Sequence, residues 1–406
     1  MKLVILGGAA HMAQPAVKYL LERENITNIV LADINVDQAN KLANQLGSKV
    51  SAQFLDINDK AMLADLITDA NLVMNFIGPY FRFGTKALEV AIDVGVDYLD
   101  ICDDYDVTIE ALKLNDVAKK KGITALIGIG ASPGITNVLS RLGSDALDST
   151  EEINTYWVVG DAEPSGFGAL THMFHIIKGE VPTFSSGKQQ NIKAFQKGSS
   201  EIIDFGDPVG AVTLYHVGHP EPVTLPKFIP GVKKVTNLGA LLPEFQNPMF
   251  KNLVDIGMTS EEPIMFRDEP VAPLEFLLAL FKQKQDEDKE KRNSVRKQKS
   301  IGAVRIEVIG ENTGGQASYT FTKSASDSMA NGTSIPAGVA ATLILEGKVP
   351  IKGVIPPECL DPKEMISALN RVNYFEGDKG FEVKRMRDGK TESGSLLDKN
   401  MFPEFW

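Results

Sequence analysis

Short apolar runs alternate with amphipathic stretches through the first third of the chain. The stretches between the runs repeat apolar residues every three or four positions, as Ala39, Leu42, Ala43 and Leu46 do, and this is the period of a helix with one buried face. Strands separated by such helices are typical of βαβ units, so the pattern predicts an α/β fold with a doubly wound, mainly parallel sheet. The runs that we interpret as its strands are residues 3–7, 29–33, 50–55, 72–77, 98–102 and 125–129.

The pattern changes beyond residue 150, where apolar and polar residues alternate within the runs. Alternation of this kind is typical of an antiparallel sheet with one solvated face, and it predicts an inserted α+β domain. Two stretches rich in proline, residues 219–226 and 242–248, are predicted to be loops of this domain. Its predicted strands are residues 153–159, 212–217, 232–237, 303–309 and 317–321.

The length of the chain favours more than one hydrophobic core. At 406 residues it exceeds the roughly 250–300 residues at which a single core stops growing. We predict a nucleotide-binding domain over residues 1–135, an α+β domain over residues 136–330, and a segment over residues 331–406 that returns to the first domain and ends in a tail.

Residues 335–345 carry the pattern of the returning helix. Pro336 is predicted to stand at the helix start, where its missing N–H group needs no partner, and small residues on one side suit close packing against another element. The tail from residue 377 is polar, and Phe402 and Trp406 are expected to anchor its end.

Composition narrows the class of protein. The chain has 42 basic and 53 acidic residues and a net charge of −11, which disfavours binding to nucleic acid or to anionic membranes. Its two cysteines, Cys102 and Cys359, are too few for a disulfide framework and favour a cytoplasmic location. No uncharged apolar run reaches the roughly 18 residues of a membrane span. The apolar run at residues 3–10 is short for a signal peptide and contains two glycines, so we keep it in the fold.

A turn rich in glycine and alanine follows the first predicted strand. Residues 8–13, Gly-Ala-Ala-His-Met-Ala, have the offsets of the dinucleotide-binding pattern G-x-G-x-x-G, with alanine at the second and third glycine positions. In that pattern, backbone amides at the following helix start bind a diphosphate. The turn predicts a Rossmann-type dinucleotide site, and a tight turn without a ligand is the alternative. The candidate cofactor residues here are Gly8, Ala9, Ala10, His11 and Met12.

An aspartate ends the second predicted strand, 25 residues after Gly8. The carboxylate of Asp33 can accept hydrogen bonds from both hydroxyls of an adenosine ribose and would repel a 2′-phosphate, which predicts NAD in preference to NADP. Capping of the next helix is the alternative role. Ligands lie beyond the carboxyl ends of parallel strands, so further candidate cofactor contacts follow the other strands: Ile34, Asp56, Ile57, Asn75, Gly78, Pro79, Cys102, Gly130 and Ser132.

A series of motifs resembles the saccharopine dehydrogenase-like family, which includes saccharopine reductases and lysine 6-dehydrogenases. The resemblance covers most of the chain up to about residue 360. It implies a Rossmann dinucleotide domain, an inserted α+β domain for catalysis and dimerisation, a homodimer, and hydride transfer at a carbon that bears nitrogen. The motifs, in family order, lie at residues 4–15, 75–80, 98–102, 122–124, 130–137 and 353–358.

Two departures from the family pattern bear on the substrate. Saccharopine reductases carry Asp-Pro-Gly where this chain has Ser132, Pro133 and Gly134, and Val159 stands where a cysteine is usual. Because those positions help to hold the amino-acid end of saccharopine, the departures argue against that substrate. Lysine 6-dehydrogenases also lack the aspartate, but residues 168–177 do not resemble theirs.

Candidate catalytic carboxylates follow the fifth predicted strand. Asp103 and Asp104 could anchor a substrate ammonium, and because neighbours in a strand alternate faces, we expect only one of them to point inward. Capping of the next helix is their alternative role. Tyr80 is a rival proton donor, whereas Cys102 is expected to be a buried packing residue.

Two histidines are candidate acid–base groups, namely His172 and His219. His172 and His175 lie three apart on a predicted helix, but no Asp, Glu or Cys completes a ligand set with them, so we predict no metal site. His219 flanks a predicted turn, where a simply solvated histidine is the alternative.

These features together predict an NAD(P)-dependent oxidoreductase. We expect hydride transfer at the CH–NH carbon of a small-molecule amine, either an amino acid, a polyamine or a secondary-amine conjugate. Such a reaction needs positioning and one group that handles the amine proton. A reductase of a C=C or C=O bond on the same fold and a non-catalytic dinucleotide-sensing protein are the alternatives.

Overall fold

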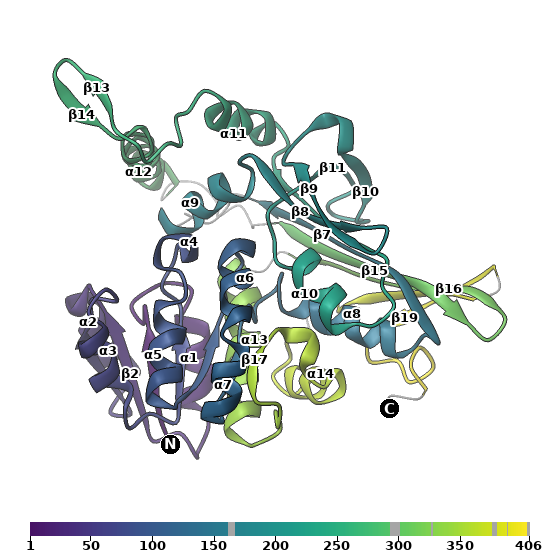
Figure 1. The fold of residues 1–406 in the computed structure, drawn as a ribbon, viewed down its shortest axis with the longest axis horizontal. Helices are drawn as coiled ribbons and strands as arrows, with labels where there is room; N and C mark the ends of the chain where they lie inside the picture. Colours follow the sequence, from purple (N-terminus) through teal and green to yellow (C-terminus); the bar gives the residue numbers. More distant parts are fainter. Residues whose placement is uncertain (161–166, 293–300, 326–327, 376–379, 388, 404–406) are drawn as a thin grey trace.

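Two large sheets organise the chain (Figure 1). The computed structural model describes residues 1–160, 167–292, 301–325, 328–375, 380–387 and 389–403. The first sheet has seven parallel strands in the order β17-β6-β5-β4-β1-β2-β3, which confirms the predicted doubly wound domain. The strands are β1 (Lys2–Leu6), β2 (Asn28–Asp33), β3 (Val50–Phe54), β4 (Leu72–Asn75), β5 (Asp97–Asp100), β6 (Thr124–Leu126) and β17 (Gly353–Ile355).

The strand order reverses direction at β1, which has β2 on one side and β4 on the other. Ligands of doubly wound sheets bind at the carboxyl ends of the strands at such a switch point. The helices that follow these strands are α1 (Gln14–Leu21), α2 (Val36–Leu46), α3 (Lys60–Ile67), α4 (Tyr80–Phe83), α5 (Lys86–Val94), α6 (Tyr105–Lys113) and α7 (Asn115–Lys121).

Both faces of the first sheet are buried along its central strands, which explains why those strands are mostly apolar, whereas the edge strand β3 is largely exposed. Leu3 and Ile5 belong to a core shared with α1 and α13 (Met329–Leu345), whereas Val4 and Leu6 belong to a core shared with α3, α5 and α7. Successive side chains of a strand point to opposite faces. Each fully buried side chain of this size stabilises the fold by about 1.5–3 kcal/mol.

The second sheet has ten strands and is mixed, so the prediction of an antiparallel sheet is only partly correct. Its path runs β10-β11-β12-β7-β15-β16-β18-β19, with β8 and β9 beside β12. β12 pairs in parallel with β7, because the connection between them crosses over through helices. The strands are β7 (Ser149–Gly160), β8 (Glu180–Ser185), β9 (Lys188–Lys193), β10 (Glu201–Asp204), β11 (Ala211–His216), β12 (Lys234–Leu242), β15 (Gly302–Asn312), β16 (Gly315–Ala325), β18 (Glu382–Arg387) and β19 (Lys390–Ser395).

Helices connect and cover this second part of the molecule. A two-stranded hairpin, β13 (Ile264–Phe266) and β14 (Glu269–Val271), projects from it beside α12 (Figure 1). The remaining elements are α8 (Ile135–Asp145), α9 (Phe167–Ile176), η1 (Lys197–Ser199), α10 (Glu221–Phe228), α11 (Gln246–Asp255), α12 (Pro273–Arg292), η2 (Pro357–Cys359) and α14 (Pro362–Asn370).

Three predictions that depended on proline are wrong. Residues 219–226 were predicted to be a loop, but α10 occupies most of this stretch because Pro222 stands in the first helical turn, where no N–H partner is needed. The second predicted loop, residues 242–248, ends inside α11. Pro336 does not begin its helix, since α13 starts at Met329. The carbonyl of Gly332, which lacks the usual partner at Pro336, accepts a hydrogen bond of 2.9 Å from the Tyr374 hydroxyl.

The C-terminal part of the chain contacts both sheets. Helix α13 packs on α1 so closely that a Cβ atom on Gly338 would lie 2.9 Å from the Tyr19 ring, and β17 extends the first sheet next to β6. Strands β18 and β19 then extend the second sheet beside β16. Phe402 is buried, and its ring stacks on that of Tyr319 at 5.2 Å. Trp406 lies outside the described residues.

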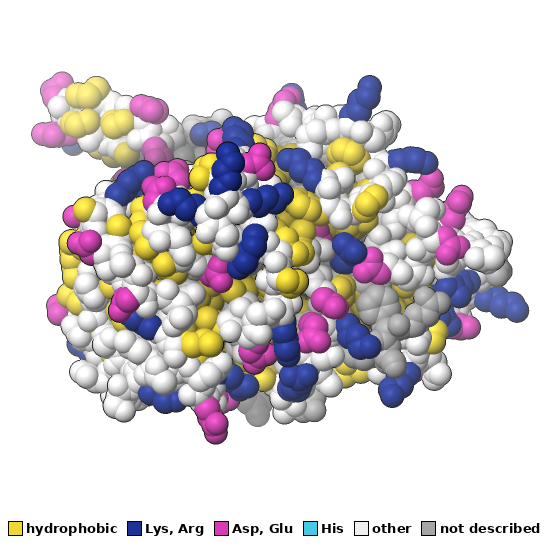
Figure 2. Space-filling view, turned by 60° about the horizontal axis from the view of Figure 1, so that its bottom comes forward, with side chains coloured by type: hydrophobic (Ala, Val, Ile, Leu, Met, Phe, Trp, Pro, Cys, Tyr) yellow, Lys and Arg dark blue, Asp and Glu magenta, His cyan; other side chains and the backbone are white. Residues whose placement is uncertain are grey.

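Basic and acidic side chains are interspersed over the face shown in Figure 2. A mixed surface of this kind offers no extended positive field for a polyanion. Among the described helices, none combines the length and the apolar character that a bilayer span requires.

Candidate active site

The turn after β1 has the geometry of a dinucleotide site. Gly7 has a φ of +70°, and a Cβ atom on Gly8 would lie 2.8 Å from the Cα atom of Leu31 in the neighbouring strand. Ala13, at the third position of the glycine pattern, is fully buried at the start of α1. The first position therefore requires glycine, whereas alanine fits where helix and strand approach each other.

Backbone amides at this turn are available to a diphosphate. Among the described residues, the N–H groups of His11 and Met12 have no hydrogen-bond partner, and they lie just before α1, whose dipole favours an anion. His11 is exposed. The Ser334 hydroxyl of α13 donates a hydrogen bond to the Met12 carbonyl, and this bond holds the turn against α13. These residues fit the pyrophosphate of a dinucleotide.

Asp33 stands at the carboxyl end of β2, directly beside this turn. Its carboxylate accepts the N–H groups of Ala9 at 3.0 Å and Asn35 at 2.9 Å. The next side chain, Ile34, is 69% exposed and offers an apolar surface next to the carboxylate. The capping alternative does not hold, because the Asn35 side chain caps α2.

The other strand-end candidates lie along the same edge but differ in availability. Asp56 is partly exposed and accepts the N–H group of Asn58 at 2.9 Å, whereas Ile57 is buried. The Asn75 amide is engaged with the Tyr98 hydroxyl at 3.1 Å and with the N–H group of Ile77. Asn75 therefore orders the turn that leads to Gly78 and Pro79.

Two further candidates, Tyr80 and Cys102, are buried away from the histidine cluster. Tyr80 is buried, and its hydroxyl donates to the Asn75 carbonyl at 2.6 Å. Burial raises the pKa of Tyr80 well above its ordinary value. Cys102 is also buried, and burial likewise raises the pKa of its thiol. The structure does not bring either group together with the histidines.

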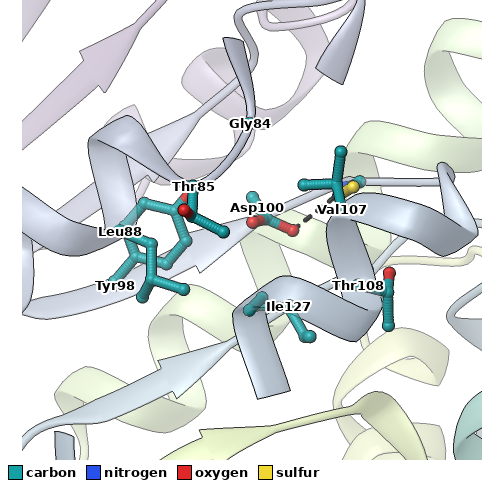
Figure 3. A pocket seen from close by; sticks show the side chains of 10 residues that line it. Gly84, Thr85, Leu88, Tyr98, Asp100, Val107, Thr108 and Ile127 are labelled. Carbon is teal, nitrogen blue, oxygen red and sulfur yellow. Dashed lines mark hydrogen bonds between the residues drawn. The ribbon is translucent and has the colours of Figure 1, made fainter. Parts of the chain in front are cut away.

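Asp100, which ends β5, was not among the sequence candidates. Its carboxylate accepts the N–H groups of Gly128 at 2.7 Å and Cys102 at 3.0 Å, and burial raises its pKa to about 6. Figure 3 shows it at the wall of a small cavity together with Thr85, Tyr98 and Thr108. This cavity lies between the first sheet and its own helices, so we interpret Asp100 as a clamp between strand ends.

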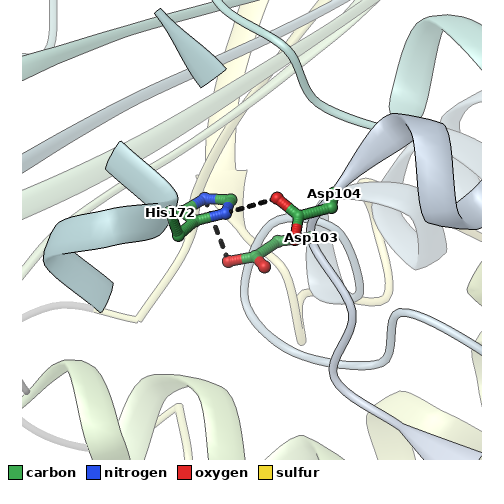
Figure 4. Close-up of side chains that lie close together, drawn as sticks. All are labelled: Asp103, Asp104 and His172. Carbon is green, nitrogen blue, oxygen red and sulfur yellow. Dashed lines mark hydrogen bonds and ion pairs between the residues drawn. The ribbon is translucent and has the colours of Figure 1, made fainter. Parts of the chain in front are cut away.

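His172 lies between the two candidate aspartates (Figure 4). Its Nδ1 atom is 2.8 Å from Oδ1 of Asp104, and its Nε2 atom is 3.2 Å from Oδ2 of Asp103. The prediction that only one aspartate points inward is wrong. Strand β5 ends at Asp100, so the alternation of a strand does not apply to the loop that carries Asp103 and Asp104.

The charges in this cluster depend on one another. Asp104 is fully buried and also accepts the N–H group of Phe81 at 2.8 Å. Burial favours its neutral form, but the contacts with His172 outweigh burial and lower the pKa of Asp104. Burial also opposes protonation of His172, yet Asp103 and Asp104 raise the pKa of His172 to about 9. Burial raises the pKa of Asp103, so Asp104 is the member of the pair whose ionised form the contacts with His172 favour.

The same three side chains meet the distance criterion for a metal site, since their ligand atoms lie within 4.8 Å of one another. Asp103 and Asp104 therefore accompany His172, which the spacing of His172 and His175 in the sequence did not indicate. One ion cannot use both nitrogens of an imidazole, because these point in diverging directions. Only Nε2 of His172 and Asp103 would face the same ion, which is fewer than the three protein ligands of a catalytic zinc site.

Helix α9 joins the two parts of the molecule at this place. His175, one turn after His172, lies 3.1 Å from Asp106 through Nε2, and its ring stacks on that of Phe81 at 4.2 Å. A Cβ atom on Gly168 would lie 3.4 Å from the Gly78 carbonyl carbon. The second part of the chain therefore supplies His172, whereas the first part supplies its two carboxylates.

His219 lies next to this cluster and is buried rather than solvated. Its ring is 5.9 Å from the His172 ring and 5.3 Å from the Trp157 ring. Trp157 is held by a hydrogen bond of 3.1 Å from its indole N–H group to Asn237, and its ring packs against Gly239, where no Cβ atom would fit.

A further carboxylate, that of Glu221, lies next to His219. Oε2 of Glu221 lies 3.4 Å from Nδ1 of His219, and Oε1 of Glu221 accepts the Ser132 hydroxyl at 2.5 Å. Glu221 is fully buried. Burial favours its neutral form, but the contacts with His219 and Ser132 outweigh burial and lower its pKa. Ser132 thus contacts an active-site carboxylate, and Gly130 forms the tight turn before it through a bridge to Gly134.

Sequence reasoning noted Glu221 beside His219 without assigning it a role, and it missed Trp157. Glu221 lies two residues after His219, but the proline-rich stretch concealed the helix that carries it. Trp157 is one of two tryptophans in the chain, and its position in a strand gave no sign of its contact with a histidine 62 residues later.

The fold and this site define an NAD(P)-dependent oxidoreductase. A parallel sheet has a dinucleotide-type turn at its switch point, and histidines and carboxylates gather beyond the carboxyl ends of its strands. Acid–base groups in that position can serve a reaction at the nicotinamide end of a dinucleotide.

Comparison with known proteins names the family. The family models of the saccharopine dehydrogenase NADP binding domain and of the saccharopine dehydrogenase C-terminal domain match residues 3–126 and 178–374. The chain belongs to the saccharopine dehydrogenase family, which confirms the resemblance read from its motifs.

The similar curated relatives act in amine chemistry, according to their names. Carboxyaminopropylagmatine dehydrogenase of Synechocystis sp. is 24% identical over 397 residues, which cover 91% of this chain and 95% of the relative. Carboxynorspermidine synthase of Vibrio alginolyticus is 23% identical over 79% of this chain and 81% of its own.

Solved structures share the fold. Apo saccharopine dehydrogenase (L-Glu forming) of Saccharomyces cerevisiae superposes with a TM-score of 0.67 at 18% identity, over 95% of this chain and all of the other. Homospermidine synthase of Legionella pneumophila, in complex with NAD, gives a TM-score of 0.55 at 14% identity, over 98% and 94% of the two chains. Both therefore support the architecture of two sheets described above.

Proposed function

We propose that this protein is an NAD-dependent oxidoreductase that acts at the C–N carbon of a polyamine or amino-acid conjugate. The observation that carries the proposal is the cluster of His172 between Asp103 and Asp104, with His219 beside it, at the carboxyl edge of the dinucleotide sheet. The named activities of the Synechocystis and Vibrio relatives concern conjugates that combine amino groups with a carboxylate.

The turn residues are proposed to hold the cofactor. The amides of His11 and Met12 bind its diphosphate, and Asp33 binds the adenosine ribose. A bound nicotinamide dinucleotide would supply the acceptor or donor of a hydride. We place Gly78 and Ser132 between this turn and the histidine cluster, because Gly78 lies beside Gly168 of α9 and the Ser132 hydroxyl donates to Glu221.

NAD is preferred to NADP in this proposal. Asp33 presents a carboxylate where a 2′-phosphate would have to lie, and like charges at close range repel each other. The residues that follow, Ile34 and Asn35, carry no positive charge. The 2′-phosphate of NADP would therefore be repelled by Asp33, and no positive charge at Ile34 or Asn35 would offset this repulsion.

Two residues, Asp103 and His219, are proposed to contact the substrate. Asp103 is half-buried, and its carboxyl oxygens can accept hydrogen bonds from a substrate ammonium. His219 faces Glu221 through Nδ1, which leaves Nε2 to exchange a proton with the substrate nitrogen. His172 is a positioning residue, because both of its nitrogens are engaged with carboxylates.

Turnover of candidate amines tests the proposal. Purified protein would be assayed for NAD reduction with carboxyaminopropylagmatine, carboxynorspermidine, lysine and saccharopine. We expect turnover of a conjugate, and a loss in kcat/KM of about 100-fold or more in His219→Gln, as is typical for an acid–base group. His216→Gln is the matched control, since His216 is buried in the same part of the molecule but outside the cluster. Absence of turnover with every amine would refute the proposal.

A further inference from the structure

Unpartnered polar atoms are concentrated in one place behind the candidate active site. Within the described residues, five buried side-chain nitrogen or oxygen atoms lack a hydrogen bond of ordinary geometry, and four of them face one another in two pairs, His219 with Glu221 and Thr224 with Glu358. Such atoms are costly because burial removes their water. Their concentration beside an acid–base histidine points to a function.

Glu358 is the deepest member of this group. It ends the motif at residues 353–358, lies in η2 and is fully buried. Its Oε2 atom accepts the side-chain N–H of Asn137 at 2.9 Å, whereas Oε1 is one of the unpartnered atoms. Burial raises the pKa of Glu358 to about 7, and the charge of Glu221 contributes to this rise.

The charged groups around Glu358 do not neutralise it. Helix α10 presents Glu221, an acid. Helix α8 presents Arg141, but this guanidinium is engaged with Asp145 at 2.6 Å through Nε. The adjacent residue in η2 is Cys359, and burial raises the pKa of its thiol to about 12. No cation is paired with the Glu358 carboxyl among the described ion pairs.

Two side-chain paths lead from Glu358 to His219. Thr224 lies beside the Glu358 carboxyl and one turn of α10 after Glu221. On the other side, the Thr136 hydroxyl lies 3.3 Å from Oε1 of Glu221 and 3.2 Å from Oδ1 of Asn137. A small and mostly apolar cavity adjoins both paths, and the side chains of Thr108, Asn137 and Thr224 are the polar groups of its lining that could hold a water molecule.

We propose that Glu358 is a proton-storing residue for the active site, exchanging protons with His219 through Glu221, Thr224 and water in the adjoining cavity. This inference rests on the proposed function of His219 as the acid–base group. Glu358 does not touch the substrate and is a positioning residue in that sense, since it acts through His219.

The proton balance in amine oxidation is as follows. The N–H bond of the substrate breaks, and its proton forms a bond to Nε2 of His219. Nδ1 of His219 releases a proton toward Glu221, and one proton arrives at Glu358, which changes from carboxylate to carboxylic acid. Water receives this proton after the product has left. In the reductive direction each transfer is reversed.

Infrared spectroscopy tests the proton-storing group without turnover. The full-length protein should show a carboxylic-acid C=O band that titrates near neutral pH and is missing in Glu358→Gln. Glu221→Gln should move this titration to lower pH, because it removes a neighbouring negative charge. A band that is unchanged in Glu358→Gln, or a titration that ignores Glu221→Gln, would overturn the proposal.

Kinetics test the link to His219. For amine oxidation, kcat/KM should rise with pH through neutrality in the unmodified protein, and Glu358→Gln should remove this rise and lower kcat about tenfold with little change in KM. Thr224→Val should also lower kcat, whereas Thr342→Val, at a buried helix threonine bonded to Gly338, should not.

The two proposals fail in distinguishable ways. Absence of turnover in the unmodified protein would refute the proposed function, and the infrared titration would still decide whether Glu358 stores a proton beside Glu221. Turnover with an unchanged pH profile in Glu358→Gln would refute proton storage alone. Restoration of the profile by Glu358→Asp would support it, because that variant keeps a carboxyl group.

Discussion

His172 is protonated in the folded protein because two carboxylates face its ring. Its pKa is raised from 6.5 to about 9, so the contribution to folding is complete below the ordinary pKa of 6.5 and is lost as the pH rises through 9. We predict that the free energy of unfolding falls by on the order of 3 kcal/mol from about pH 6 to about pH 9 through this residue. Urea denaturation across this range measures the fall.

The matching variant separates this effect from other titrations. His172→Gln should flatten the pH dependence, while His11→Gln, at an exposed histidine outside the cluster, should follow the unmodified protein. Parallel curves for His172→Gln and the unmodified protein would show that the two aspartates do not hold the imidazole in its charged form.

We predict that the single carboxylate of Asp33 determines the preference for NAD over NADP. Asp33→Ser should weaken NAD binding about tenfold or more, because a bidentate acceptor for the ribose is lost. NADP binding should weaken less or improve, because the repulsion of the 2′-phosphate is relieved. Calorimetric titration with both dinucleotides measures the change.

Asp37→Asn is the control for this substitution. It removes the same charge from the nearby first turn of α2 but does not contact Ala9. An equal loss of NAD affinity in both variants would mean that general charge, rather than the ribose contact, underlies the preference.

Single residues were recognisable from the sequence where their chemistry was local. Asp33 follows a strand at the spacing that the dinucleotide pattern requires, and it lies beside the turn as expected. The pairing of His172 with Asp104 spans 68 positions, so no local pattern could reveal it. Glu358 was visible only as part of a motif, because its significance depends on what surrounds it in space.

At the scale of elements, α13 depends on a side chain from outside the helix. Pro336 offers no N–H group to the Gly332 carbonyl, and the Tyr374 hydroxyl takes its place. We predict that Tyr374→Phe destabilises the protein by about 1 kcal/mol, the usual net value of one hydrogen bond. Urea denaturation gives the value.

A double-mutant cycle tests the cause of this loss. Pro336→Ala restores the backbone donor, so Tyr374→Phe should cost clearly less in that background. The Lys323 ammonium over the Tyr374 ring, at 4.6 Å, is retained by phenylalanine. If Tyr374→Phe destabilised the protein equally in both backgrounds, the Tyr374 hydroxyl would not be replacing the missing backbone donor at Pro336.

Elements were predictable where burial and periodicity agreed. The six N-terminal parallel strands were predicted because both of their faces are apolar. Strand β17 has three residues and is followed directly by two prolines, whereas the equally short β6 lies within a longer apolar run. Helices α10 and α13 were misjudged because proline was read as a boundary, while the buried apolar residues on both sides of it stabilise the helices.

At the scale of the whole molecule, the hairpin β13–β14 projects away from both sheets (Figure 1). Ile264, Met265 and Phe266 are exposed on it, and Phe276 is exposed on the neighbouring α12. An isolated two-stranded sheet is marginally stable in water, and contiguous exposed apolar residues mark an interaction surface. We predict that a second copy of the chain covers this arm in a homodimer.

Light scattering coupled to size exclusion measures the assembly. The full chain should be a dimer, and Phe266→Asp should make it a monomer. Ile202→Asp is the control, because Ile202 is similarly exposed on β10, which lies on the far side of α11 from the hairpin in Figure 1. A dimer that survives Phe266→Asp but not Ile202→Asp would place the interface on the second sheet instead.

His172 and Asp104 come from different parts of the molecule. A change in how these parts are arranged would therefore change the pKa of His172. If the parts separated, the imidazole would return toward its ordinary pKa of 6.5 and would lose a proton near pH 7–8. Opening would thus release a proton, and by linkage alkaline conditions favour the open form while mild acid favours the closed one.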